Sequence, residues 1–243
     1  MLKKLLISSY FAIALSCISS AGLTAEPRQF FDEQTFSSGA RGNITIVEQN
    51  TKQAFANKAI RQAFAKMKSI DEQLGSKPGN TREHLNNLKK GKDYPLSPEI
   101  FTLFSKAIYL SKVTNGWFDL AAPSAPSSFT QRDYRRIILN KDKKSIRYKS
   151  NKMSLDMRWF LKAAMVDTAI ASLQSSGVTN AKVEIDGVSR HIGHDIYTPW
   201  SIVVGLTKQG ENKLAHRAFR YDLTSAATVL ITPQNAGNLI DAK

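Results

Sequence analysis

The chain has 243 residues, a length that suits one domain with its own hydrophobic core, and it contains no internal repeat or low-complexity tract. Its formal net charge of +14 favours anionic partners such as phosphates, acidic proteins or a lipid surface, although many such charges serve only as a solvated surface. The one cysteine, Cys17, lies in the N-terminal segment, so the rest of the chain excludes a disulfide or a thiolate metal site.

The N-terminal segment has the features of an export signal. Lys3 and Lys4 precede a mostly apolar run, Leu5 to Ile18, which is too short to span a bilayer comfortably. Leu23-Thr24-Ala25 then suits a cleavage site. We therefore expect residues 1–25 to be a signal peptide and the mature protein to be periplasmic.

Cleavage after Ala25 leaves residues 26–243 as one domain and removes two lysines, which lowers the formal net charge from +14 to +12. The alternative is a lipoprotein signal that ends at Cys17, which follows a small residue but lacks the usual Leu three positions earlier. Export argues against a nucleic-acid partner and limits membrane contact to the signal peptide or a lipid anchor.

The first half of the mature chain predicts one strand and two helices. A Gly-rich approach over residues 38–42 leads into the strand Ile44–Val47. Apolar residues at helical spacing predict a helix over residues 52–74, broken by Gly75 to Asn80, with His84 beyond it as a solvated helix residue. A second helix begins at Ser97-Pro98-Glu99 and runs to Val113.

The second half predicts hairpins around one further helix. A hairpin over residues 134–154 precedes that helix, whose apolar face reads Trp159, Ala163, Val166, Ile170 and Leu173 and which ends at Ser175-Ser176-Gly177. The remaining predicted strands are a hairpin with an Asp-Gly turn over residues 183–193, a strand from Trp200 to Leu206, and its partner from Leu214 to Tyr221.

Charged residues gather where the last predicted helix begins. Asp156, Lys162 and Asp167 lie at this strand-to-helix joint. A lysine near a helix start can meet a phosphate, because the backbone N–H groups and the helix dipole favour an anion at the same end. The alternative is a surface lysine on an ordinary amphipathic helix.

Two motifs carry a family resemblance. Asp156, Lys162, Val166 and Asp167 match in register the D-L-G-G-I-A-K-G-Y-A-V-D motif of the ApbE-type flavin transferases, with Arg158 and Trp159 in place of its Gly pair. Gly116-Trp117-Phe118-Asp119 is similar to the G-x-F-D-P-T of the same family. An Asp in such a turn can also cap the local backbone.

Weaker matches follow the order of the family's motifs over residues 36–243. Arg41-Gly42-Asn43 stands where the family has M-G-T, and Gly187 and Gly193 match a G-G-D segment in which Asp186 replaces the first Gly. Thr224-Ser225 resembles part of A-T-S-G. The resemblance implies a mixed α/β fold: a single domain with helices packed on largely antiparallel sheets.

The resemblance also implies a reaction and a ligand. Such enzymes transfer FMN from FAD to a Thr of a target protein and use Mg²⁺, so FAD is the expected ligand and a periplasmic flavoprotein the expected target. The residues implied to contact FAD are Arg41, Trp117, Phe118, Asp119, Asp156, Lys162, Thr224 and Ser225. No catalytic residue or metal ligand is assigned. The family's D-A-D-x-x-A-T segment would follow Asn238 to Lys243, so we expect an incomplete magnesium site.

Three functions stay open at this point. The first is a flavin transferase, the second a non-catalytic relative that binds a flavin or a partner protein, and the third a basic exported interaction module. His191 and His194, three apart in a turn-prone loop beside Asp195, suggest a metal site only weakly because no further ligand is evident.

Overall fold

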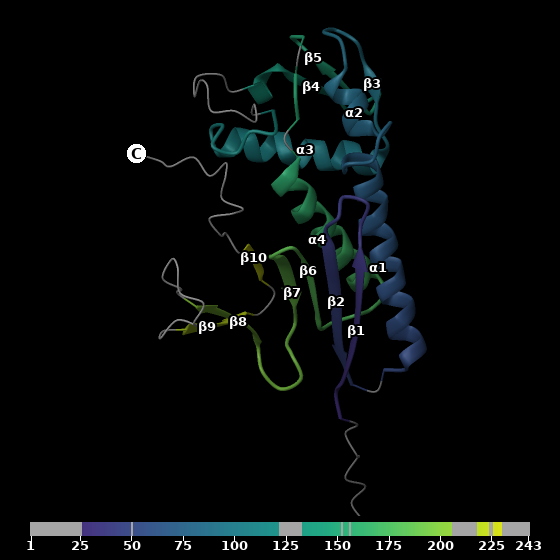
Figure 1. Cartoon of the computed structure of the whole chain (residues 1–243), viewed down its shortest axis with the longest axis vertical. Helices are drawn as coiled ribbons and strands as arrows, with labels where there is room; N and C mark the ends of the chain where they lie inside the picture. Colours follow the sequence, from purple (N-terminus) through teal and green to yellow (C-terminus); the bar gives the residue numbers. More distant parts are fainter. Residues whose placement is uncertain are drawn as a thin grey trace, which may run out of the picture.

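The structure is a computed structural model that describes residues 26–49, 51–121, 133–151, 153–155, 157–205, 218–223 and 226–229. It has two parts, a large sheet covered by two long helices and a smaller part that holds a further helix and a short sheet (Figure 1). This is the mixed α/β arrangement with antiparallel sheets that the family resemblance implies. No helix in the described part of the chain is long and apolar enough to cross a membrane.

The large sheet has five antiparallel strands in the order β1-β2-β6-β7-β10. A two-stranded sheet, β8-β9, follows β7 along the chain. The strands are β1 (Arg28–Thr35), β2 (Arg41–Glu48), β6 (Ala181–Ile185), β7 (Val188–Ile192), β8 (Trp200–Gly205), β9 (Ala218–Leu223) and β10 (Ala227–Val229).

Strand β1 is absent from the sequence prediction, which begins at residue 36. It pairs with β2 along its whole length, yet Phe30 is its only buried residue. An edge strand that buries one side chain lacks the alternation of buried and exposed residues by which a strand is recognised in a sequence. Strand β1 therefore forms through its hydrogen bonds to β2.

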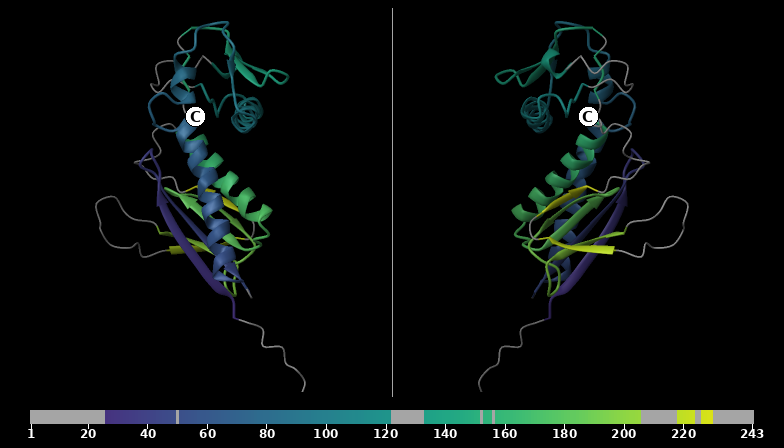
Figure 2. Two further views of the ribbon diagram at one scale, coloured as in Figure 1. Left: turned by 90° about the vertical axis from the view of Figure 1, so that its right-hand side faces the viewer. Right: turned by 90° about the vertical axis from the view of Figure 1, so that its left-hand side faces the viewer.

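The helices α1 (Gln53–Leu74) and α4 (Arg158–Ser175) pack side by side on one face of this sheet (Figure 2). The core between them comes from alternate strand residues and from helix residues at a spacing of three or four. Fully enclosed members of this core are Ile44, Ile46, Val183, Ile185, Ala63, Met67, Ile70, Ala169 and Leu173.

The predicted inward face of α4 is wrong at Ala163, which is exposed, and its first member, Trp159, lies outside the side chains that the structure describes. The buried residues of α4 instead include the adjacent pairs Phe160 and Leu161, and Ala164 and Met165. Such pairs arise because α4 contacts both α1 and the strands β6 and β7, so its buried arc is wider than one stripe. The predicted residues Val166, Ile170 and Leu173 are buried, so the spacing located the middle of this arc but not its width.

The smaller part contains α2 (Thr81–Asn86), α3 (Pro98–Val113), a 3₁₀ turn η1 (Asp133–Arg136) and a three-stranded antiparallel sheet in the order β3-β5-β4. Its strands are β3 (Tyr94–Pro95), β4 (Ile137–Asn140) and β5 (Ser145–Tyr148). Helix α3 begins as predicted, because the Ser97 hydroxyl accepts a hydrogen bond from the Ile100 N–H at 3.3 Å.

Two contacts connect the two parts beside the start of α4. The Leu155 N–H donates to Asn86 Oδ1 at 3.0 Å, which ties the segment before α4 to α2. The ring of Phe118, beyond the end of α3, lies 6.3 Å from the ring of Phe160 in the first turn of α4. The start of α4 is therefore the place where the large sheet part and the smaller part meet.

Candidate functional site

The β6–β7 hairpin turn places a carboxylate between two other elements. Asp186 and Gly187 form this turn with φ values of 44° and 83°, as in the two-residue turns that favour Asp-Gly. Asp186 Oδ2 lies 3.0 Å from Lys162 Nζ, and Oδ1 accepts a hydrogen bond from the Arg41 N–H at 3.1 Å. The structure thus joins the predicted residues Arg41 and Lys162 through Asp186.

This junction is accessible to solvent. The side chains of Lys162 and Asp186 are 32% and 37% exposed, and Arg41 is exposed. An ion pair with this much solvent contact contributes only about 0–1 kcal/mol to stability, because water screens both charges. The ammonium group of Lys162 is therefore not buried in the core, and its pairing with Asp186 contributes little to the stability of the fold.

The Gly116–Asp119 corner meets α4 by a different route. Phe118 contacts Phe160, whereas Trp117 beside it is 57% exposed. Phe160 and Lys162 are two positions apart, or roughly 200° around the helix, so their side chains leave α4 in different directions. Both motifs therefore converge on the first turns of α4, but Lys162 faces the hairpin turn while Phe160 faces the corner.

The carboxylate of Asp119 holds the backbone of its own corner. Oδ1 accepts from the Ala121 N–H at 2.9 Å and Oδ2 from the Tyr134 N–H at 3.3 Å. This is the backbone-capping role named as the alternative from the sequence. A contact between Asp119 and FAD stays a prediction, as do those of Trp117 and Phe118. Asp156, Thr224 and Ser225 lie outside the described residues.

His191 has a different environment from the one expected, because it lies within β7 and is fully buried. Its ring lies 5.9 Å from that of Trp200, and neither ring nitrogen has a hydrogen-bond partner. Burial, reinforced by the nearby Lys182, lowers the pKa of His191 below its ordinary value of 6.5.

The neighbouring His194 hydrogen-bonds locally, with Nδ1 2.7 Å from the Asp195 carbonyl oxygen. Across the residues with a described position, no three His, Cys, Asp or Glu side chains gather where they could hold a metal ion. These residues therefore do not fit a magnesium site by themselves, and we assign no chemical step to a metal.

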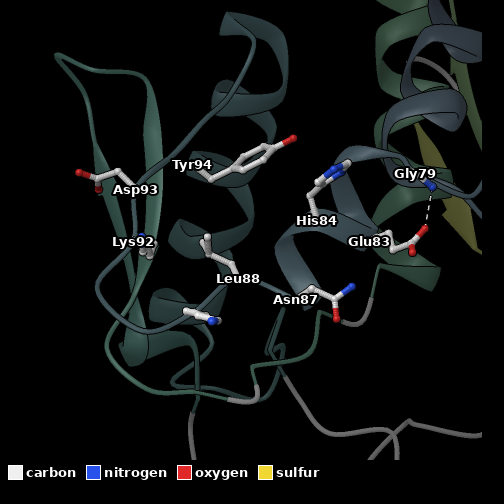
Figure 3. Close-up of a pocket in the computed structure, with 9 residues that line it drawn as sticks. Gly79, Glu83, His84, Asn87, Leu88, Lys92, Asp93 and Tyr94 are labelled. Atoms are coloured by element: carbon white, nitrogen blue, oxygen red, sulfur yellow. Dashed lines mark hydrogen bonds between the residues drawn. The ribbon is translucent and has the colours of Figure 1, made fainter.

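A pocket that sequence reasoning missed lies beside α2 in the smaller part (Figure 3). Its volume is about 430 Å³, and it includes His84, whose ring stacks on Tyr94 at 5.8 Å, together with Lys89 and Lys92. The predicted FAD contacts that the structure describes do not line it. The sequence offered a run of lysines after α2 as its only signal, which is typical of any solvated loop.

Comparisons with known proteins find one family model and several solved structures that resemble this chain. The family model described as "ApbE family" matches residues 123–229. A solved structure of the flavinyl transferase ApbE from Pseudomonas stutzeri, in its apo form, is 18% identical with a TM-score of 0.64 and covers 83% of this chain and 66% of its own. No curated protein matches the chain in sequence.

Two further solved structures are similar. The flavin transferase ApbE from Vibrio cholerae is 17% identical with a TM-score of 0.65, covering 83% of this chain and 70% of its own. The apbe protein from Thermotoga maritima is 17% identical with a TM-score of 0.62, covering 82% and 69%. The present chain therefore spans about two thirds of the length of these proteins.

These findings confirm the resemblance drawn from the sequence. The chain has the fold of the solved flavin transferases, and residues 123–229 match the ApbE family model.

Proposed function

We propose that this chain is an exported FAD-binding protein of the ApbE type that transfers FMN from FAD to a threonine of a periplasmic flavoprotein. The observation that carries the proposal is the convergence of two distant motifs on the start of α4. Phe118 packs against Phe160 on one side of the first turns of α4, and Lys162, two residues further, points toward the β6–β7 turn with its side chain partly exposed. The similarity in fold to solved flavin transferases also supports this proposed function.

The proposed reaction is a phosphoryl transfer. The Thr hydroxyl oxygen of the target forms a bond to the FMN phosphorus, the bond from that phosphorus to the bridging oxygen breaks, and AMP leaves with the electron pair. The hydroxyl proton passes to solvent. Negative charge grows on the phosphate oxygens during this step, and Lys162 is the residue we place near them as a point charge.

A second candidate is a relative that binds a flavin without transferring it. Two observations favour it: the Lys162 ammonium already has a carboxylate partner in Asp186, and the described residues do not gather into a metal site. Loss of one good electrostatic stabiliser costs about 3 kcal/mol, or roughly a hundredfold in rate. A chain with this site as it stands would therefore retain binding more readily than catalysis.

The first test is a titration of FAD into residues 26–243, followed by an assay for AMP release and for covalent flavin on a Thr-containing target peptide with Mg²⁺ present. Lys162→Met should weaken FAD binding about tenfold, equivalent to roughly 1.4 kcal/mol. Lys182→Met is the matched control, since Lys182 also pairs with a carboxylate, that of Glu184 at 2.7 Å, but away from α4.

Each outcome separates the candidates. AMP release together with labelled peptide supports transfer, while tight FAD binding without AMP supports the non-catalytic relative. The absence of any FAD binding would overturn both and leave the basic interaction module. An equal effect of Lys162→Met and Lys182→Met would remove Lys162 from the proposed site.

Export is a separate part of the proposal and has its own test. The whole chain, expressed in a Gram-negative host, should yield a periplasmic protein whose first residue is Glu26. A product that begins at Cys17 and carries the added mass of lipid would establish the anchored alternative. An intact N-terminus in the cytoplasm would contradict both.

A further inference from the structure

We infer that Asp186 is an internal competitor for the anionic ligand of Lys162, and that it sets how strongly this site accepts a phosphate group. The inference rests on the proposed function in taking Lys162 as the cation of the ligand site. It goes further in naming a residue of this chain that weakens the site, and in giving the direction in which its removal changes affinity.

The contacts of Asp186 are those that a phosphate oxygen would make. One carboxylate oxygen lies 3.0 Å from the Lys162 ammonium and the other accepts from the Arg41 backbone N–H at 3.1 Å. An ammonium and a backbone N–H are the donors that bind phosphates in proteins, and a carboxylate uses the same donors with similar geometry. While Asp186 holds both, an incoming phosphate must displace it.

The turn itself does not need this carboxylate. Asp186 has a φ of 44°, in the left-handed region that Gly and Asn enter with the least strain. The backbone link of the turn to β2 is made separately, by the Asp186 N–H to the Arg41 carbonyl oxygen at 3.2 Å. A residue without a charge would therefore complete the hairpin as well as Asp does.

The competitor is also weakly held, as a displaceable group must be. More than a third of the Asp186 side chain is exposed, so screening by water keeps its attraction to Lys162 small. Replacing Asp186 with a neutral residue leaves Lys162 without its carboxylate beside the exposed Arg41. The local charge then rises by one unit, which favours an anion at short range.

A purely structural role for Asp186 makes the opposite prediction. If the carboxylate only fastens α4 and β2 to the turn, its removal lowers stability and does not improve ligand binding. A gain of affinity is thus a readout that a structural role would not produce. Asp186→Asn is the sharpest variant, because Asn suits the left-handed φ and keeps an oxygen for the Arg41 N–H.

The experiment compares residues 26–243 as wild type, Asp186→Asn and Asp186→Gly by calorimetric titration with FAD and with inorganic pyrophosphate. Both variants should bind each ligand about tenfold more tightly than wild type. The double variant Asp186→Asn with Lys162→Met should lose that gain. Glu184→Gln is the control, because it removes one acidic group from the same hairpin without touching Lys162.

The outcomes distinguish this inference from the proposed function. A gain for both ligands supports the two together, and a gain for pyrophosphate without FAD binding supports the role of Asp186 while overturning the flavin function. FAD binding that Asp186→Asn leaves unchanged, or that Glu184→Gln raises equally, overturns the role of Asp186 alone. If no variant binds either ligand, both are overturned.

Discussion

Buried polar residues show how single side chains fix the surroundings of the site. Asp71 of α1 is fully buried, and its Oδ2 accepts hydrogen bonds from the Ser37 hydroxyl at 2.5 Å and the Ser38 N–H at 3.4 Å. These bonds hold the loop that leads into β2 and Arg41. A Cβ at Gly75 would lie 2.3 Å from the Asp71 carbonyl oxygen, so the chain needs glycine where α1 ends.

Another buried polar residue, His191, predicts how the stability of the fold depends on pH. The unfolded chain titrates this imidazole near 6.5, whereas burial lowers the pKa of His191 in the folded protein. Between the two values only the unfolded state binds the proton, so the free energy of unfolding falls as pH falls below about 6.5. The loss is at most about 1.4 kcal/mol per pH unit and is absent above about pH 7.

Urea unfolding at several pH values between about 7.5 and 5 measures this effect. His191→Phe removes the titrating group and keeps an aromatic ring beside Trp200, so its stability should fall less steeply with pH than that of the wild type. Equal slopes for wild type and His191→Phe would contradict the prediction.

At the scale of elements, Asn80 connects the end of α1 to the start of α2. Its Oδ1 accepts from the Glu83 N–H at 3.0 Å and its Nδ2 donates to the Gly75 carbonyl oxygen at 2.9 Å. Asn80→Ala loses both bonds at a buried position and should lower the free energy of unfolding by about 2 kcal/mol. Asn80→Ser restores the cap but not the donor and should recover about half.

Chemical denaturation of the two variants provides the measurement, with Ser97→Ala as a reference. Ser97 caps α3 by accepting from the Ile100 N–H, and its hydroxyl also donates to Gln73 Oε1 at 3.4 Å in an exposed contact, so its loss should cost only about 1 kcal/mol. If Asn80→Ala were no more destabilising than Ser97→Ala, the link to Gly75 would contribute nothing.

The elements with strong local signals were predictable from the sequence. Helix α3 has its Ser97-Pro98 start, and the β6–β7 hairpin has its Asp-Gly turn, so chain-local chemistry determines both. Strand β1 and the buried arc of α4 were not, since pairing and packing against distant segments define them. In the candidate site the motifs singled out Lys162 and Phe118, whereas the ion pair of Lys162 with Asp186 depends on tertiary contact.

At the scale of the whole molecule, α1 runs from the large sheet to the smaller part, and the start of α4 lies between the two (Figure 1). A ligand at this junction contacts a protein whose formal net charge is +14 for the whole chain and +12 once the two lysines of residues 1–25 are removed. Such a charge attracts anions over a distance that salt shortens, from about 10 Å at 0.1 M to about 3 Å at 1 M.

The charge of the molecule therefore predicts how salt affects flavin binding. FAD carries a diphosphate, whereas riboflavin has the same ring system without a phosphate. If the cations around Lys162 and Arg41 contribute to binding, the dissociation constant for FAD should rise several-fold between about 50 and 500 mM salt. That for riboflavin should stay nearly constant, because ring contacts near Phe118 and Trp117 are not screened.

Fluorescence titrations of both ligands at each salt concentration make the comparison within one protein preparation. Asp186→Asn sharpens it, since one fewer negative charge should steepen the salt dependence for FAD and leave riboflavin unaffected. Equal salt dependence for the two ligands would mean that the diphosphate does not meet the basic junction. Binding would then depend on the ring system alone, and the cationic surface would serve some other anionic partner.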